Sequence, residues 1–299
     1  MKKSQLITLV ILFVAVSIFI WVGACGEDTS DIPNPDSTIS IQTTPSGQTA
    51  VPTKSPVATA APTMNPGAQV DFTKLSGLST QELDTYASFD SKEFSDSETT
   101  EALAGYRYLL SNPGSDTNDI YLAFMLHYSD VNPRVEKLLQ LAKDENVKFT
   151  FFVSSMYLNE EENAATIKKI YDEGHTIGSR GDKSIDQLSV SAEALADSLT
   201  AMRLRLAEIA GPGAIMNVYS PDAISQRNAK LANLMGYTVV FKLCNFVTDG
   251  GSRDEVYNGV QFQSSEISDG LVTQVTSFVE WATAQGYTFK GFKGELIYG

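Results

Sequence analysis

One histidine and several carboxylates are the residues of this sequence whose types could do metal or acid–base chemistry. Each follows a segment that we expect to be a β-strand; they are His127, Asp130, Asp182, Asp222 and Glu266. Loops at the carboxyl ends of parallel strands meet on one side of a sheet, so these side chains can line one groove, where we also place Tyr219. A histidine with carboxylates can bind a divalent cation. Acidic chains carry acids at loop ends by default, and that ordinary explanation is the stronger one.

Other catalytic arrangements have less support. The chain contains two histidines, and we interpret the second, His175, as a residue that packs or hydrogen-bonds inside the fold. A serine or cysteine nucleophile activated by histidine therefore has no second residue to support it. Glycine-rich loops of the kind that hold phosphate groups are also missing from the sequence.

Residues 119–155 predict a strand, a loop, a helix and a second strand. Residues 120–126 form a short apolar run, typical of a strand that is covered on both faces. A helix follows, with Asn132 as its N-cap and Pro133 in its first turn. Residues 148–153 are rich in aromatic and β-branched side chains and predict the next strand. Such units place functional loops at the carboxyl ends of their strands.

The rest of the chain repeats this alternation of strand and helix. Further strands are expected at residues 176–178, 215–220, 238–244, 260–264 and 287–292. Helices are expected at residues 160–172, 192–210, 226–235 and 271–284. The pattern predicts an α/β protein, built either as a parallel barrel or as a doubly wound sheet.

The first residues are typical of an export signal. Lys2 and Lys3 precede an apolar run over residues 6–22, and Gly23 and Ala24 lead to Cys25. Small residues before a cysteine resemble the bacterial lipoprotein signal, in which residues 1–24 are cleaved and Cys25 carries the lipid. The run is marginal for a spanning helix. An uncleaved signal anchor is the alternative, and both place the remaining chain on the outer side of the cytoplasmic membrane.

Three further segments follow the signal. Residues 25–70 are predicted to be a disordered tether that begins at the lipidated cysteine, since they are rich in proline, serine and threonine and hold no aromatic residue. Residues 71–118 predict an N-terminal helical elaboration, with helices at 80–87 and 98–111. Residues 119–299 form the predicted main domain.

Charge and cysteine content exclude some classes of partner and fold. The chain has 36 acidic and 22 basic residues, with a formal net charge of −14. Electrostatic attraction to nucleic acid or to anionic wall polymers is therefore disfavoured. Only two cysteines are present, so a disulfide framework is excluded, and we interpret Cys244 as a small buried apolar residue.

Several of the predicted elements resemble the polysaccharide deacetylases, and in particular their peptidoglycan and spore-cortex branch. The segments that carry this resemblance are residues 121–124, 147–153, 172–178, 234–241 and 286–289. The resemblance covers roughly residues 119–292 and implies a distorted barrel of about seven parallel strands. It also implies metal-assisted hydrolysis of an acetamido group, with zinc or another divalent ion held by one aspartate and two histidines.

The positions that would carry this chemistry hold other residue types. Met125 stands where the resemblance implies the aspartate base, and Leu126 where it implies the aspartate that binds the metal. Arg180 and Ser184 stand at the two histidine positions, and Ser265 lies near the position of the histidine that protonates the leaving amine. The resemblance therefore implies a domain that has lost its catalytic residues and needs no metal cofactor.

These observations favour an envelope-anchored pseudoenzyme of this family. It would bind glycan or peptidoglycan, or scaffold an envelope protein, through the former substrate groove, and it would not bind nucleic acid. The first alternative is an active metal-dependent carbohydrate N-deacetylase with a site rebuilt around His127. The second is a solute-binding lipoprotein, which would need two lobes and a hinge.

Overall fold

The strands of this protein pair in parallel to form one curled sheet. In this computed structural model the described residues are 70–84, 86–87, 97–109, 111, 115–241, 243–249 and 255–293. All of them belong to one compact unit, residues 58–299. The predicted signal peptide, the lipidated Cys25 and all of the tether but its last residue lie outside these residues. Among the helices of the described part of the chain, none is both long and apolar enough to cross a membrane.

The sheet follows the order β1-β8-β9-β3-β4-β5-β6-β7-β2, and β10 pairs with β3. Its strands are β1 Tyr86–Ala87, β2 Tyr108–Leu109, β3 Asp119–Leu126, β4 Thr150–Ser154, β5 Thr176–Gly181, β6 Val218–Tyr219, β7 Thr238–Val240, β8 Leu243–Asn245, β9 Gln261–Ser264 and β10 Thr288–Phe289. Strands that are adjacent in sequence, from β3 to β7, are also adjacent in the sheet. This order confirms the predicted distorted barrel and excludes the doubly wound alternative, because a doubly wound sheet reverses its strand order.

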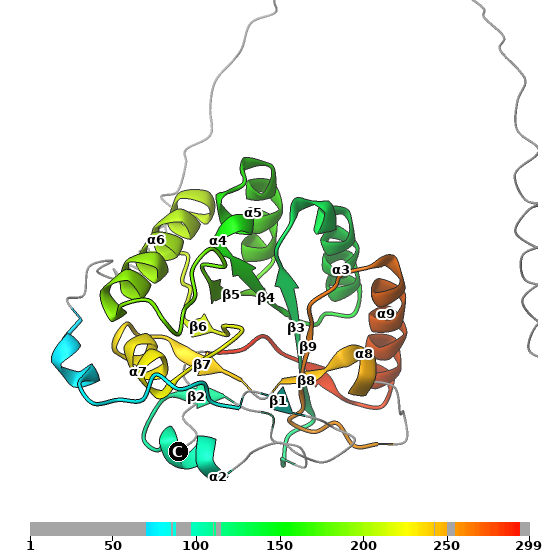
Figure 1. Ribbon diagram of the computed structural model, residues 1–299. Coiled ribbons are helices and arrows are strands. Elements are labelled where there is room, and N and C mark those ends of the chain that lie inside the picture. The colour runs from blue at the N-terminus through cyan, green and yellow to red at the C-terminus, as the bar shows by residue number, and fades with distance from the viewer. Residues whose placement is uncertain are drawn as a thin grey trace, which may run out of the picture. The chain divides into compact units, whose positions relative to one another are not determined.

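Helices surround the outer face of the sheet, as Figure 1 shows. They are α2 Ser97–Ala102, α3 Asn132–Asp144, α4 Ser155–Asn159, α5 Ala164–Asp172, α6 Ala192–Ala210, α7 Gln226–Leu234, α8 Phe246–Asp249 and α9 Asp269–Ala284, with 3-10 turns η1 Phe72–Leu75, η2 Ser129–Val131 and η3 Glu161–Asn163. The longest helix, α6, has the predicted bounds. It buries one apolar stripe, which includes Leu195, Leu199 and Leu206, because these residues recur every three to four positions.

Strand β3 separates two apolar clusters, because alternate residues of a strand point to opposite faces. Leu122, Phe124 and Leu126 lie in the large cluster between sheet and helices, which we call the outer core. Ala123 and Met125 lie on the other face, in a smaller inner cluster. The inner cluster also contains Leu109, Phe152, Val218, Val240, Leu243 and Phe292. The interior of the barrel is therefore filled by these apolar side chains.

The N-terminal prediction of helices at 80–87 and 98–111 is wrong in most of its length. Tyr86–Ala87 pairs with β8 as strand β1, and Tyr108–Leu109 pairs with β7 as strand β2. Only the start of the second predicted helix forms, as α2. Tyr108 and Leu109 are buried, so their pairing and packing on the sheet outweigh the local preference for helix.

Two smaller predictions also need correction. Asn132 does not cap α3 from outside the helix: it is the first helical residue, and its side chain bonds Asn163 and Tyr157 instead. The strand expected at 238–244 is divided into β7 and β8.

The predicted packing roles of His175 and Cys244 are confirmed. The Nδ1 atom of His175 accepts a hydrogen bond of 3.1 Å from the backbone N–H of Phe149, and the ring lies against Phe149 and Phe151. The neutral imidazole is required for this bond, and burial, aided by the charge of Lys148, lowers the pKa of His175 to about 4. Cys244 is fully buried, and its sulfur lies 3.8 Å from the hydroxyl of Ser111.

Candidate functional site

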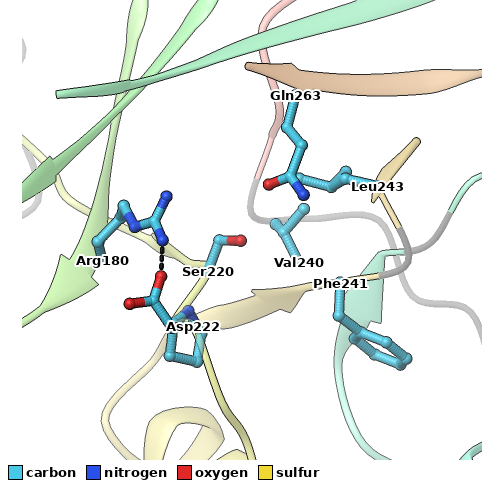
Figure 2. A pocket seen from close by; sticks show the side chains of 8 residues that line it. Arg180, Ser220, Asp222, Val240, Phe241, Leu243 and Gln263 are labelled. Atoms are coloured by element: carbon cyan, nitrogen blue, oxygen red, sulfur yellow. Dashed lines mark ion pairs between the residues drawn. The ribbon is translucent and has the colours of Figure 1, made fainter. Parts of the chain in front are cut away.

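A cavity of about 130 Å³ lies at the carboxyl ends of several strands, where parallel barrels carry their functional loops. Its walls come from β5, from the loop after β6, from the end of β7 and the start of β8 with Phe241 between them, and from β9. The lining residues are Arg180, Ser220, Pro221, Asp222, Val240, Phe241, Leu243 and Gln263. Figure 2 shows Arg180 and Asp222 on one side of this cavity and Gln263 and Leu243 on the other.

Arg180 reaches the cavity because β5 turns at the next residue. Gly181 has a φ of +77°, which L side chains rarely adopt. A Cβ atom there would also collide with the side chain of Gln187. The pairing of β5 with β4 shifts register at Val153 and Ser154, just beside this turn. Glycine at position 181 therefore allows the strand to end with the arginine directed into the cavity.

The charges of the cavity form a group of three. Arg180 and Lys183 both make ion pairs with the carboxylate of Asp222. The arginine is only 9% exposed, and burial lowers its pKa to about 10, so it remains a cation at neutral pH. Asp222 is partly exposed, with 44% of its side chain accessible to solvent. The structure thus gives Arg180 a carboxylate partner, Asp222, and adds Lys183, a residue that sequence reasoning did not select because no pattern marked it.

His127 lies at the end of β3, close to this group. Burial and, to a smaller extent, the positive charge of Arg180 lower its pKa to about 4. The imidazole is therefore neutral at neutral pH. Neutral imidazole can bind a metal, but the neighbouring guanidinium repels a divalent cation, so the proximity of Arg180 disfavours a metal site rebuilt around His127.

The donor groups present do not fit the divalent ion that the resemblance implies. Met125 and Leu126 are both buried, and they point to opposite faces of β3, Met125 into the inner cluster and Leu126 into the outer core. Leu126 offers no ligand atom, and Arg180 brings a positive charge. Within the described residues, no group of three or more histidine, cysteine, aspartate or glutamate side chains is placed to hold a metal ion.

Asp182 has a structural role that its position in the loop did not reveal. Its Oδ1 atom accepts hydrogen bonds from Ser155 at 2.9 Å, from the backbone of Ser184 at 2.8 Å and from the Ser184 hydroxyl at 2.7 Å. Partial burial pushes its pKa upward, but the bonds from Ser184 and Ser155 together outweigh burial and hold the pKa below its usual range. Asp182 therefore fixes the turn after β5 and ties it to α4.

The remaining predicted groove residues do not line the cavity. Tyr219 is fully buried in the outer core, where its hydroxyl donates to Gln187 and its ring lies against Tyr237. Asp130, Ser265 and Glu266 are exposed on their loops. The structure thus brings together Arg180, Asp222 and His127 from the predicted set. Among the lining residues it adds Ser220 and Gln263, which stand next to predicted positions.

Residues 114–240 match the sequence model of the polysaccharide deacetylase family. The chain is 29% identical over 184 residues to the peptidoglycan-N-acetylmuramic acid deacetylase PdaA of Bacillus subtilis, covering 57% of this chain and 68% of that protein. Its fold matches a family 4 carbohydrate esterase from Bacillus anthracis with a TM-score of 0.59 at 22% identity, over 72% of this chain and 95% of the other.

The fold also matches a CE4 family pseudoenzyme from Bacillus anthracis, with a TM-score of 0.50 at 13% identity, over 59% of this chain and 64% of the other. The strand order, the site at the carboxyl ends and the matched segment all agree with the resemblance drawn from the sequence. Residues 114–240 thus carry the signature of the polysaccharide deacetylases.

Proposed function

We propose that this protein is a non-catalytic polysaccharide deacetylase homologue that binds glycan or peptidoglycan, or holds a partner protein, in the groove at the carboxyl ends of its sheet. One observation carries the proposal: the buried guanidinium of Arg180, paired with Asp222, stands in the cavity where the family chemistry calls for a metal ligand. A fixed cation at this point opposes the binding of a second, divalent cation.

The positions of the base and of the metal-binding aspartate support the same conclusion. A thioether at Met125 cannot accept a proton from water, and the Leu126 side chain is packed in the outer core. Restoring a metal ligand at position 126 would place a carboxylate in an apolar environment unless the strand end were rearranged. The relative from Bacillus anthracis that is described as a CE4 family pseudoenzyme shows that this fold also occurs without activity.

Glycan binding is supported by what the groove retains. The cavity mixes polar groups, such as Ser220 and Gln263, with apolar walls, as binding sites for small molecules commonly do. Tyr128 follows His127 at the end of β3, with 65% of its surface exposed. An exposed aromatic ring beside a polar cavity is suited to stack on the apolar face of a sugar. Peptidoglycan is the polymer named for the relative from Bacillus subtilis, which makes it the first glycan to test.

The envelope location is part of this proposal. The run over residues 6–22 and the small residues before Cys25 support cleavage and lipid attachment at that cysteine. Residues 25–70 would then hold the domain away from the outer surface of the cytoplasmic membrane, within reach of the wall. Metabolic labelling with a fatty acid, lost on Cys25→Ser, would test this anchoring.

Two measurements test the function. Acetate release from acetylated chitooligosaccharides and from peptidoglycan, with zinc supplied and the Bacillus subtilis deacetylase as positive control, is expected to stay at background. Calorimetry with the same glycans is expected to show binding that Tyr128→Ala weakens and that Leu204→Ala, at an exposed apolar residue of α6, leaves unchanged. Zinc-dependent acetate release that His127→Ala abolishes would overturn the proposal. A lack of binding to any wall glycan would overturn the glycan part of it.

A further inference from the structure

The charges of the ion-pair group beside the cavity do not balance. Arg180 and Lys183 are two cations that share one carboxylate, Asp222. His127 is neutral and so adds no negative charge. Arg180 and Asp222 line the cavity, and Lys183 adjoins it through its ion pair with Asp222, so this group of three carries one excess positive charge, in a chain whose formal net charge is −14. Excess positive charge in a cleft of an otherwise acidic protein attracts an anionic ligand.

The guanidinium also has an unused donor. The Nε atom of Arg180 is buried and makes no hydrogen bond within the described residues, while another nitrogen of the same group pairs with Asp222. A buried donor without an acceptor is costly, so native structures rarely retain one without a purpose. A ligand that supplies acceptor oxygens would remove this cost. Arginine is the side chain best suited to receive a planar carboxylate, because its N–H groups form a fork.

The rest of the wall limits the size and kind of ligand. The cavity measures about 130 Å³, several times the space that one water molecule needs, and it is polar at Ser220 and Gln263 but apolar at Val240 and Leu243. It can admit one small charged group with an alkyl substituent, while the remainder of a larger molecule would stay in the groove outside. One excess positive charge balances a monoanion more closely than a phosphate dianion.

We infer that this cavity is a carboxylate-binding site and that its ligand is an acidic sugar unit of a glycan, held by Arg180, Lys183 and Gln263. The inference rests on the proposed glycan binding and extends it by naming the ligand group. The positions that would hold a metal in an active enzyme would here hold the anionic substituent of the sugar itself. Binding is expected to weaken as ionic strength rises, because Lys183 is solvent-exposed.

Calorimetry on the purified protein with a matched pair of ligands tests the inference. The pair is an oligosaccharide that contains N-acetylmuramic acid, with its free carboxylate, and the same oligosaccharide with that group converted to the amide. We expect at least tenfold tighter binding of the acid. Arg180→Gln should lower the affinity for the acid to that for the amide and so remove this preference. Lys137→Gln removes a surface charge on α3 that pairs with Asp269, and as the control it should leave the preference intact.

The outcomes separate the two proposals. Equal binding of acid and amide would overturn the carboxylate site and leave glycan binding standing, whereas binding of neither would overturn glycan binding itself. Free acetate that binds as tightly as the acidic oligosaccharide would overturn the assignment to a sugar. Should Arg180→Gln fail to fold, Lys183→Gln at an exposed position gives the same test, with a smaller expected loss of about threefold to tenfold. Retention of the full preference in both variants would also contradict the inference.

Discussion

At the amino end of β3, Asp119 accepts hydrogen bonds from Thr288 at 2.6 Å and from Lys290 at 2.8 Å, both on or just after β10. Partial burial raises the pKa of Asp119, but the bonds from Lys290 and Thr288 outweigh that effect and hold it below its usual range. One cation meets one carboxylate here. At the carboxyl ends of the strands, Asp222 faces two cations, and one of them keeps a buried donor without an acceptor.

The two histidines differ in a similar way. Both have pKa values of about 4, chiefly because of burial. His175, at the amino end of β5, uses its Nδ1 atom to accept the N–H of Phe149 and packs between aromatic rings. His127, at the carboxyl end of β3, lies beside Arg180 and an exposed tyrosine. The hydrogen bond and ring contacts of His175 indicate a structural role, whereas the buried Nε of Arg180, the neighbour of His127, finds no acceptor among the described residues and indicates a place for a ligand.

The largest effect on stability is expected from His175→Ala. The substitution leaves the buried N–H of Phe149 without an acceptor and opens a cavity between Phe149 and Phe151, so it should cost about 3 kcal/mol. Urea unfolding followed by circular dichroism would measure the loss. The matched variant His127→Ala at the other end should cost less than about 1 kcal/mol. Equal losses would contradict the distinction between the two ends.

Acid should weaken the fold through the same histidine. The pKa of His175 is about 4 in the folded protein and about 6.5 in an unfolded chain, so the unfolded state binds the proton first. The contribution is intact above pH 6.5 and is lost as the pH falls from there toward 4, which amounts to roughly 2–3 kcal/mol.

Unfolding free energies measured between pH 7 and 4.5 would check this dependence. His175→Gln cannot take up the proton and should remove about half of the slope over that range, because His127 has a similarly lowered pKa and contributes the rest. Asp119 and Asp182, whose pKa values are lowered, lose their contributions at lower pH and do not explain a decline that begins near 6.5. A slope that is the same in the variant and in the natural protein would contradict the prediction.

Asp119→Asn should have a smaller effect. The amide keeps one acceptor for Thr288 but loses the charge that pairs with Lys290, whose side chain is half exposed. A loss of about 1–2 kcal/mol is expected, because Asp119 itself is buried. Asp269→Asn, which removes an exposed carboxylate that pairs with Lys137 and Arg134, serves as the control and should cost less than about 0.5 kcal/mol. Glycan binding should be unaffected in both variants, and a loss of binding would contradict the separation of the two ends.

Most of the barrel could be predicted from the sequence because its apolar runs are long and regular. Ala192–Ala210 repeats its stripe over five turns, and β3 after its first residue, Asp119, is a run of apolar and aromatic side chains. The short N-terminal strands could not be predicted, since the two residues of β1 or of β2 carry no periodicity. They exist because β8 and β7 supply pairing partners far away in the sequence. Long-range pairing of this kind leaves no local signal.

The sequence predicted which positions lie at the site, but it did not predict how the side chains at those positions interact. Sequence comparison located Arg180 and Asp222 but could not show that they form an ion pair, nor that Lys183 joins them. Tyr219 was placed in the groove because it precedes a loop. The two residues of β6 instead point to opposite faces, Val218 to the inner cluster and Tyr219 to the outer core. A strand of two residues has no pattern from which that register could have been read.

Arg180→Met is expected to have the smallest effect on stability, even though it removes the most buried charge of the site. Burying a guanidinium is costly, and replacing a buried ion with an apolar side chain of similar length is often neutral or stabilising. Val240 and Leu243 line the cavity that the methionine would enter, and the exposed Asp222 would keep Lys183 as its partner. The unfolding free energy should therefore stay within about 1 kcal/mol of its natural value, while the preference for the acidic glycan disappears. A loss above about 3 kcal/mol in urea unfolding would show that the Arg180–Asp222 pair stabilises the fold as the Asp119–Lys290 pair does. The charges at the carboxyl ends of the strands would then be explained by stability alone, as those at the amino end are, and would no longer indicate a ligand site.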